Sequence, residues 1–486
     1  MAASGFSLGG EIGRRLPLLF STFLALLCQK LFHPRRSVRW PDMRTTSVVD
    51  VLAQSADAGW EGRLAVWLEP YLRLFGHQAQ RRWAPVYLQG LLGPGDRKSI
   101  QPMASRVARD DFWQLHHFVA TSGWDTAPLE RQLAQDAEAL LGGPDAHLIV
   151  DDTGLPKKGD HSVGVAHQYC GQVGKNANCQ VLVSLTLSRD EIPVPVALKL
   201  FLPESWASDG KRCQRAGVPD GLGHRAKWQI ALEEIDRLVG AGVSFGDVLA
   251  DAGFGNVRAF RNGLTERGLT WAVGIQSTTA VYPVSVRTRL PRRKATGRRC
   301  IHPRPSRKQL LAKTLIANLG PRAFRTIAWR TGTKGELSAR FAVVRVRLAD
   351  GPEIRARQYV PSDEGWLVCE RRSNQDKFYL TNHGPHASLE QLAAVIKARW
   401  SCEQAHQQLK EELGLDHFEG RSWNGLHHHA LLTMMAFLFL QTLRSEEKKR
   451  PLLHAVATAC PQGDSGHDGP HRYLPTMRIP RATASA

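Results

Sequence analysis

Apolar residues between about Trp60 and Leu141 recur every three or four positions, which is the spacing of amphipathic helices. RLAVWLEPYLRLF and APVYLQGLLG carry this pattern, and the second segment ends at Gly93-Pro94-Gly95. MASRVARDDFWQLHHFVATSGW and APLERQLAQDAEALLGG each predict one further helix. The pattern therefore predicts an all-helical block in this part of the chain.

From His147 onward the period changes to that of strands. HLIVDD, CQVLVSLTLS and IPVPVALKLF predict three strands, the last two joined by a turn at Arg189-Asp190. KWQIALEEIDRLVGAG predicts a helix, FGDVLADAGFG a buried strand ending at Asp251, VRAFRNGLTERG a helix and LTWAVGI a strand. Hairpins followed by β-α-β crossovers predict a mixed sheet with helices on its faces, an α/β class of fold.

A different pattern follows this block. From Pro283 to Lys308 there are ten basic residues and no acidic ones, and the prolines and the glycine disfavour a helix. AFRTIAWRTGTKGELSARFAVVRVRL predicts a hairpin around Gly332–Gly335, and GWLVCERR and KFYLTN predict two more strands. We therefore expect a β-rich insertion. The pattern then returns to helix in SLEQLAAVIKARWSCEQAHQQLKEELGL and HHHALLTMMAFLFLQTLR, and after about Ser445 the composition is typical of disorder.

Two of the predicted strands end in aspartate, Asp151 in the first and Asp251 in the fourth. If these strands are neighbours, both carboxylates emerge at the same level of the sheet and repel each other, unless a divalent cation lies between them. Magnesium suits such a site because it prefers hard oxygen ligands. Two such ions can activate an attacking oxygen and stabilise a leaving one in phosphodiester chemistry. A solvated strand end, with Asp151-Asp152 opening a turn, is the alternative.

A third acidic ligand could come from the long helix. Arg399, Glu403, His406 and Lys410 are separated by four, three and four positions, which places them on one helical face. A solvated helix face has the same spacing. The two strand-end aspartates favour the hypothesis that this face borders a cleft and that Glu403 completes the site.

Composition changes the picture mainly through charge. At 486 residues the chain can hold two or three domains, and 64 lysines and arginines against 45 acidic residues give a formal net charge of +19. This excess favours a polyanionic partner, most often nucleic acid, although a plain cationic surface remains possible. The 8 cysteines form no CxxC pair, which fits a reducing cytoplasm better than a disulfide framework or a zinc knuckle.

The segment RRLPLLFSTFLALLCQKLF near the N-terminus has the arginines and the apolar run of a signal peptide. The run is short for a membrane span, and HPRRSVRW follows in place of a clean cleavage site. We expect a nonfunctional leader or an amphipathic helix, and a cytoplasmic protein without membrane contact. A secreted or membrane-tethered cationic protein is the alternative.

Four segments, taken together and in this order, are specific to one family: VDDTGLPKKGDHSVGVAHQYCGQVGKNANCQVLVSLTLS, FLPESW, VLADAGFG and RWSCEQAHQQLKEELGLDHFEGRSW. This set resembles the DDE-type transposases of bacterial insertion sequences, in the branch often called family 701, over roughly residues 60–445. The resemblance implies a ribonuclease H-like catalytic core whose catalytic and metal-binding acids are Asp151, Asp251 and Glu403. It implies two Mg²⁺ ions per active site, for which Mn²⁺ can substitute.

The resemblance also assigns neighbouring residues. Related cores have Asp, any residue, then Ser or Thr, and Asp151-Asp152-Thr153 fits this register, so Asp152 is expected to be a turn residue or to support the site. Larger relatives carry a Tyr-Arg-Glu-Lys signature, which Arg399, Glu403 and Lys410 fit. Ile396 stands where that signature has its tyrosine, so no role of the tyrosine carries over.

DNA contacts are expected from cations around these acids, with a solvated loop, turn or helix face as the alternative for each. The candidates are Arg399, Lys410, Lys157, Lys158, His406, Arg292, Arg293 and Lys294. The run His427-His428-His429 has no spaced cysteine or second histidine pair, so zinc is disfavoured and we expect a surface position at a helix N-terminus.

Pattern and resemblance together predict six segments: a leader, disordered or partly helical, over 1–57; a helical DNA-binding domain over 58–143; the first part of the core over 144–280; the β-rich insertion over 281–385; helices completing the core over 386–445; and a disordered tail over 446–486. The implied function is metal-dependent cleavage and strand transfer at the terminal inverted repeats of an insertion sequence, by a homodimer on double-stranded DNA. A catalytically inactive, transposase-derived regulator is the alternative.

Overall fold

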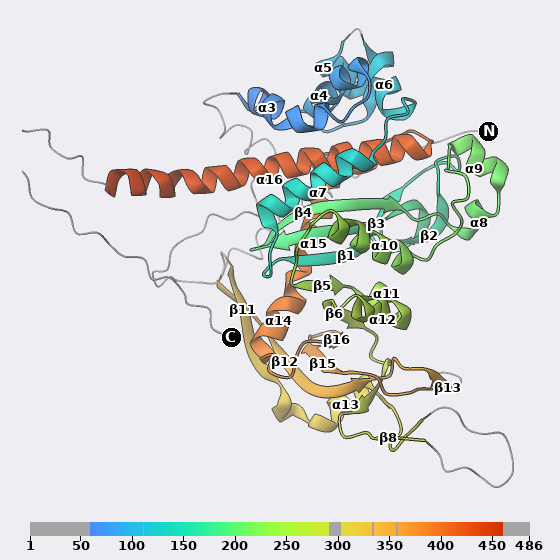
Figure 1. The fold of residues 1–486 in the computed structure, drawn as a ribbon, viewed down its shortest axis with the longest axis vertical. Helices are drawn as coiled ribbons and strands as arrows, with labels where there is room; N and C mark the ends of the chain where they lie inside the picture. Colours follow the sequence, from blue (N-terminus) through green and yellow to red (C-terminus); the bar gives the residue numbers. More distant parts are fainter. Residues whose placement is uncertain (1–58, 110, 291–302, 333–334, 356–357, 460–486) are drawn as a thin grey trace, which may run out of the picture. The chain divides into compact units, whose positions relative to one another are not determined.

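The computed structural model describes residues 59–109, 111–290, 303–332, 335–355 and 358–459 (Figure 1). The chain divides into two compact units between Leu443 and Arg444, and the sheet and the candidate site belong to the first unit. The leader over 1–57 and the candidates Arg292, Arg293 and Lys294 lie outside the described residues. Within the described ranges, no helix has both the length and the apolar character that a membrane crossing requires.

Helices precede the first strand: α3 Trp60–Leu72, α4 Gln78–Leu92, α5 Ile100–Val107, α6 Phe112–Ala120 and α7 Ala127–Leu141. The segment MASRVARDDFWQLHHFVATSGW, predicted as one helix, is divided between α5 and α6, so that prediction was wrong. Ala108 leaves the helical region with φ −151° and ψ 55°, and Asp111 immediately precedes α6. Aspartate is unfavourable in a helix interior, which is consistent with the break at Asp111, although its side chain makes no capping hydrogen bond to α6.

One 12-stranded sheet forms the centre of this unit, in the order β10-β7-β12-β15-β16-β6-β5-β1-β3-β2, with β4 paired to β3 and β11 to β12. The strands are β1 His147–Pro156, β2 Ala166–Cys170, β3 Lys175–Arg189, β4 Ile192–Leu200, β5 Asp247–Ala250, β6 Thr270–Ile275, β7 Ala280–Pro283, β10 Leu310–Leu311, β11 Arg325–Gly332, β12 Gly335–Leu348, β15 Glu364–Arg371 and β16 Lys377–Thr381. Strands β1, β5 and β6 pair in parallel, and antiparallel pairs flank them. The mixed α/β class predicted from the sequence is confirmed.

Helices cover both faces of the sheet: α7, α10 Lys227–Gly240, α11 Ala252–Gly255, α12 Arg258–Glu266, α14 Leu389–Ala398 and α15 Trp400–Glu411. Side-chain alternation along the strands separates two cores. Ile149 and Leu249 pack with α14 on one face, whereas Leu148 and Val248 join the core that includes α10 and α12. Burial on both faces explains why β1 and β5 appear in the sequence as continuous apolar runs.

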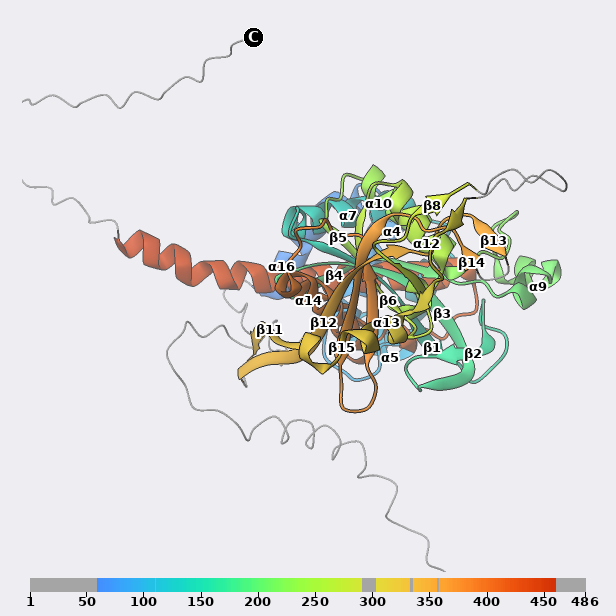
Figure 2. The same ribbon diagram turned by 90° about the horizontal axis from the view of Figure 1, so that it is seen from below.

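The strands that follow Ile275 extend this same sheet. β16 pairs with β6 from Phe378↔Ile275 to Thr381↔Ala272, β15 and β12 continue outward, and α13, Ala312–Leu319, packs against β12 (Figure 2). The hairpin predicted around Gly332–Gly335 is confirmed as β11–β12. Two short pairs form separate sheets, β8 Thr288–Arg289 with β9 Arg304–Pro305 and β13 Glu353–Arg355 with β14 Gln358–Tyr359.

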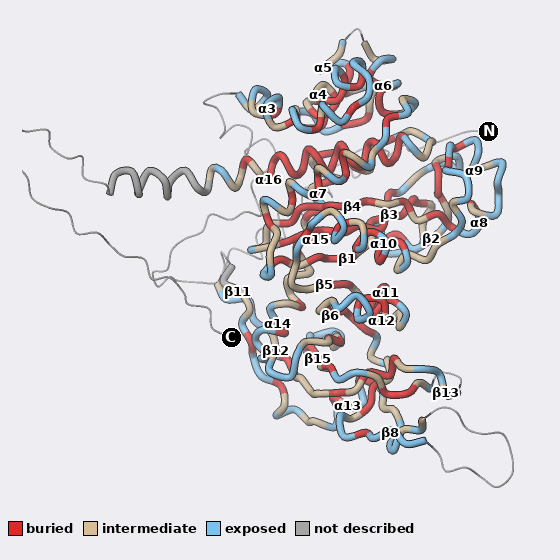
Figure 3. Tube along the Cα trace, in the orientation of Figure 1, coloured by how far each residue is buried: buried red, intermediate tan, exposed pale blue. Residues whose placement is uncertain are grey.

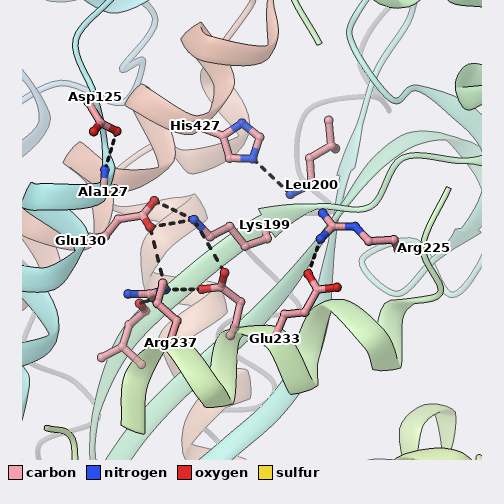
Figure 4. A network of polar contacts seen from close by, with 11 residues as sticks. Asp125, Ala127, Glu130, Lys199, Leu200, Arg225, Glu233, Arg237 and His427 are labelled. Carbon is pink, nitrogen blue, oxygen red and sulfur yellow. Dashed lines mark hydrogen bonds and ion pairs between the residues drawn. The ribbon is translucent and has the colours of Figure 1, made fainter. Parts of the chain in front are cut away.

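A buried ionic network joins α7 to β4 and α10 (Figure 4). The Lys199 ammonium donates to both oxygens of Glu130, at 2.8 and 2.7 Å, and lies 3.8 Å from Glu234. Arg237 donates to Glu234 at 2.7 Å and lies 3.9 Å from Glu130. Burial raises the pKa of Glu130, but the charges of Lys199 and Arg237 outweigh it and hold that pKa below its usual value. Helix α7 is thus tied to the sheet by paired charges as well as by apolar packing.

The last helix, α16, runs from Trp423 to Ala459, whereas the sequence predicted its end near Arg444. Up to Leu443 most of its residues are buried (Figure 3). The surface position predicted for the histidine run is wrong, because His427, His428 and His429 are only 9%, 1% and 0% exposed. They can be buried because their ring nitrogens have hydrogen-bond partners; His429, for example, bonds the Tyr87 hydroxyl at 2.8 Å and the Gly414 carbonyl at 3.0 Å.

These histidines predict a loss of stability in mild acid. Burial lowers the pKa of His427 and of His429 to about 4, whereas a histidine in an unfolded chain titrates near 6.5. Between these values the unfolded chain binds protons that the folded chain does not, so the free energy of unfolding falls as the pH drops, by about 1.4 kcal/mol per pH unit for each histidine. Urea unfolding at pH 7.5, 6.0 and 5.0 measures this slope.

His429→Gln should reduce the slope, because glutamine can keep one hydrogen bond but takes up no proton. The raised pKa values of Asp151 and Asp251, described below, act in the opposite direction, since protonation of these carboxyls favours the folded state. A protein more stable at pH 5.0 than at pH 7.5 would contradict the assignment of neutral, buried histidines.

Candidate active site

The sheet brings the first two acidic candidates side by side. Strands β1 and β5 pair in parallel up to Val150↔Ala250, and the next residue along each segment is an aspartate, Asp151 within β1 and Asp251 just after β5. The prediction that β1 ends at Asp151 was wrong, because β1 continues to Pro156 as a partner of β3. What ends at Asp151 is the parallel ladder, and the two carboxylates therefore emerge at the same level, as the sequence predicted.

Alternation along β1 separates Asp151 from Asp152. Asp151 has the same parity as Ile149 and lies on the face covered by α14 and α15. Asp152 points to the other face, where its carboxylate accepts from the Lys227 ammonium of α10 at 2.6 Å. This placement fits the expectation that only one aspartate of the pair faces the site.

Asp251 is held by the turn that follows β5. Its Oδ1 accepts from the backbone N–H groups of Gly253 and Phe254, at 2.9 and 3.3 Å, so the carboxylate caps the short helix α11. Gly255 lets α11 lie directly on β6, since a Cβ at this position would come within 2.0 Å of the Gly274 carbonyl oxygen. The motif ADAGFG thus fixes both the backbone and the carboxylate.

Arg399 links the third candidate to the first. The helix predicted from SLEQ to ELGL is divided into α14 and α15 at Arg399, although this residue keeps helical angles of φ −55° and ψ −27°. Its Nη1 donates to Asp151 Oδ2 at 2.8 Å, and its Nη2 forms an ion pair with Glu403 Oε1. The guanidinium therefore lies between two of the three acids. The Arg399 side chain is 22% exposed, and that of Glu403 is 60% exposed.

The charges of this cluster act strongly on one another. Burial raises the pKa of Asp151, although Arg399 opposes this effect. Burial, and then the negative charge of Asp151, raise the pKa of Asp251. Burial lowers the pKa of Arg399, but the charges of Asp151, Glu403 and Asp251 outweigh it and raise that pKa, so the guanidinium stays protonated. Two neighbouring carboxylates repel each other when both are ionised, so positive charge nearby stabilises their ionised forms.

Two further residues hold Asp151, and sequence reasoning missed one of them. The Asp152 backbone N–H donates to Asp151 Oδ1 at 2.8 Å, and the Cys402 thiol donates to Asp151 Oδ2 at 3.3 Å. Cys402 is fully buried, and burial raises the pKa of its thiol, so it stays a protonated donor. No signal in the sequence distinguishes it from an ordinary core cysteine.

A cavity of about 720 Å³ opens beside this cluster. Asp251, Glu403 and Arg399 line it, and the strands that follow Ile275 form its other wall. That wall contributes cations and aromatic rings that the sequence did not point to: Trp329, Arg330, Arg372 and Lys377. In the sequence these residues are only charged or aromatic positions within predicted strands. Such positions do not show which site they face until the pairing of β16 with β6 is known.

The remaining candidates for DNA contact fall into two groups. Lys410 donates to the Gly154 carbonyl at 2.9 Å and Lys157 to the Phe418 carbonyl at 2.6 Å, and Lys158 is exposed next to it. His406, in contrast, is only 8% exposed, and its Nε2 bonds the Ser184 hydroxyl at 2.8 Å. Burial lowers the pKa of His406 to about 4, so it is a neutral group inside the fold, which does not present it to DNA.

Divalent cations such as Mg²⁺ prefer oxygen ligands, and the carboxylates of Asp151 and Asp251 are ligands of this kind. In the described part of the chain, no three His, Cys, Asp or Glu side chains are placed to hold one ion among them. The Arg399 guanidinium lies between Asp151 and Glu403 and pairs with both. The carboxylates of Asp151 and Asp251 have the donor chemistry of a divalent-cation site, and a protein cation pairs with the first of them.

Comparison with known proteins agrees with this geometry. Residues 70–336 match the model of a family described as DDE superfamily endonuclease. The chain is also 30% identical over 189 residues to a probable transposase for insertion sequence element IS701 from Microchaete diplosiphon. That match covers 39% of this chain and 47% of the relative, so the chain spans about half the length of the protein it resembles. The region matched by the family model contains Asp151 and Asp251 and ends before Glu403.

Proposed function

Because this chain belongs to the DDE superfamily of endonucleases, we propose that it is the transposase of an insertion sequence, with Asp151, Asp251 and Glu403 as its catalytic acids. The substrate would be double-stranded DNA at the terminal inverted repeats of the element. The core would be ribonuclease H-like, and the helices over 58–143 would contribute to DNA binding. A homodimer would bring two ends together.

The observation that carries this proposal is the juxtaposition of two carboxylates at the end of one parallel ladder, beside a partly buried cation. The negative charge of Asp151, together with burial, raises the pKa of Asp251, so keeping both carboxylates here costs folding free energy. Such an arrangement is typical of a site that binds positive charge for its chemistry.

The residues present would hold two divalent ions, Mg²⁺ or Mn²⁺, through Asp151, Asp251 and Glu403. When bound, such ions lower the pKa of an attacking water and stabilise the leaving oxygen of a phosphodiester. The chain itself fixes the geometry: Asp152 and Cys402 orient Asp151, and the N–H groups of α11 orient Asp251. Arg399 and Lys410 would bind DNA phosphates, where a guanidinium is suited to bidentate contact.

Cleavage at an element end leaves a 3′-hydroxyl, and we propose that the same acids serve its in-line attack on target DNA. Neither step needs a covalent bond between protein and DNA. The site can therefore work without a nucleophilic serine or tyrosine, and none is placed among the residues that orient the two aspartates.

The test is cleavage of labelled duplexes that carry the candidate ends found beside the gene. We expect Mg²⁺-dependent nicks at the element boundary, and none in duplexes of the same length with scrambled ends. If the protein binds the ends but does not nick them in Mg²⁺ or Mn²⁺, the transposase-derived regulator becomes the better hypothesis.

A further inference from the structure

We propose that Arg399 is a releasable counter-ion: without DNA it occupies the cation position among the acids, and it leaves that position for a DNA phosphate, so that metal binding is coupled to DNA binding. This inference rests on the proposed function, since it assumes that the same acids bind the catalytic ions. It adds a regulatory step that the assignment of three acids does not contain.

The contacts of Arg399 show that it fills this position. One guanidinium nitrogen donates to Asp151 Oδ2 at 2.8 Å, and another pairs with Glu403 Oε1. Its charge also acts on Asp251, although no direct contact joins the two side chains in the contacts described for these residues. One side chain thus balances three carboxylates that come from three separate parts of the chain.

A metal ion and this guanidinium compete for the same oxygen atoms. Asp151 Oδ2 already accepts from Arg399 and from Cys402, and Oδ1 accepts from the Asp152 backbone N–H. A carboxylate offers about four lone-pair sites, and two cations on one oxygen repel each other at short range. Arginine does not deprotonate in proteins. The side chain must therefore rotate away before Asp151 and Glu403 can share an ion.

The cavity next to Arg399 can accommodate its guanidinium after the side chain rotates away from the acids. Arg399 lines the cavity of about 720 Å³, and Arg330, Arg372 and Lys377 bring further positive charge to the same cavity. Without DNA, the ion pairs with Asp151 and Glu403 hold the guanidinium on the acids. A phosphodiester in the cavity changes this balance, because it attracts the cations of the cavity wall and offers the Arg399 guanidinium a bidentate partner. The switch thus responds to DNA.

The experiment measures Mn²⁺ affinity by titration with electron paramagnetic resonance detection, with and without a duplex that already ends at the cleavage position. In the wild type we expect the duplex to increase Mn²⁺ affinity by on the order of tenfold, and Mn²⁺ to increase duplex affinity by the same factor. In Arg399→Gln we expect Mn²⁺ to bind without DNA about tenfold more tightly than in the wild type, and the effect of the duplex to shrink.

Arg325→Gln is the matched control. Arg325 pairs with Glu390 at 3.1 Å in an exposed ion pair, and it neither lines the cavity nor contacts the three acids. Its removal should leave DNA-free Mn²⁺ affinity unchanged. Equal or weaker Mn²⁺ binding in Arg399→Gln than in the wild type would overturn the proposal. If Arg399→Gln does not fold, as judged by thermal unfolding, Arg399→Met, which also removes the charge, replaces it, and the same comparison of Mn²⁺ affinity with the wild type decides.

Failure of the proposed function gives a different result. Asp251→Asn should abolish Mn²⁺ binding in both the wild-type and the Arg399→Gln background. If Mn²⁺ binding persists in Asp251→Asn, the metal site itself is misassigned. If it disappears there while Arg399→Gln binds no more tightly than the wild type, only the counter-ion role fails.

Discussion

Asp251→Asn should lower Mg²⁺-dependent nicking of element-end DNA by on the order of 10³-fold or more, the scale expected when an essential catalytic group is removed. The substitution removes a negative charge from the site but little else. Asparagine Oδ1 can still accept from the backbone N–H groups of Gly253 and Phe254, which now bond to Asp251. The cap of α11 and the fold should therefore survive, and duplex binding should be retained. Single-turnover nicking on labelled duplexes measures the effect.

Asp236→Asn is the matched control for this experiment. Asp236 lies on α10 in an exposed ion pair with Arg267, and it does not line the cavity beside Asp251 and Glu403. The Asp236→Asn variant should nick element-end DNA at the wild-type rate. Loss of less than about tenfold in Asp251→Asn would argue against a catalytic role for this carboxylate.

Stability provides a second readout for the same variant. Burial and the charge of Asp151 raise the pKa of Asp251, so the stability associated with this group is present at low pH and is lost as the pH rises through its folded pKa. At pH 7.5 without metal, Asp251→Asn should therefore unfold at a temperature equal to or above that of the wild type. A clear loss of stability would show that the carboxylate holds the fold together and would weaken the functional assignment.

The sequence predicted the pair of aspartates because the information is local. Each follows a short, continuously apolar strand, and parallel strands place their carboxyl ends at one edge of a sheet. The spacing of Arg399 and Glu403 likewise predicted that they share a helix face, and they form an i,i+4 ion pair. The sequence also placed Glu403 in one site with Asp151, but it did not predict that Arg399 itself pairs with Asp151, which lies 248 residues away along the chain.

The errors have a common physical cause, which is tertiary contact. The histidine run is polar in the sequence, yet it is buried because partners from distant segments, among them Tyr87, Val119 and Leu200, satisfy the ring nitrogens. His406 is buried for the same reason, through Ser184. The sequence pattern did not predict that the strands over 281–385 line the cavity, because local periodicity does not encode which distant strands pair.

The second large effect concerns the attachment of these strands to the core. Arg261 of α12 and Asp350, which follows β12, form a bidentate ion pair whose side chains are 5% and 3% exposed. Asp350→Ala should lower the free energy of unfolding by about 3–5 kcal/mol, because it leaves a buried guanidinium without its counter-charge. Urea and thermal unfolding measure this loss. Glu69→Ala, which removes an exposed i,i+4 partner of Arg73, should leave the transition nearly unchanged.

The double variant Arg261→Met with Asp350→Leu tests whether the ion pair only stabilises the fold or also positions Asp251. Replacing both charges with apolar groups removes the unpaired ion and should recover most of the lost stability. Arg261 also donates to the Gly255 carbonyl, on the turn that carries Asp251. We therefore expect the double variant to be stable but slower in nicking, because α11 loses a support. Full activity together with full stability would show that the pair holds the insertion strands without positioning Asp251.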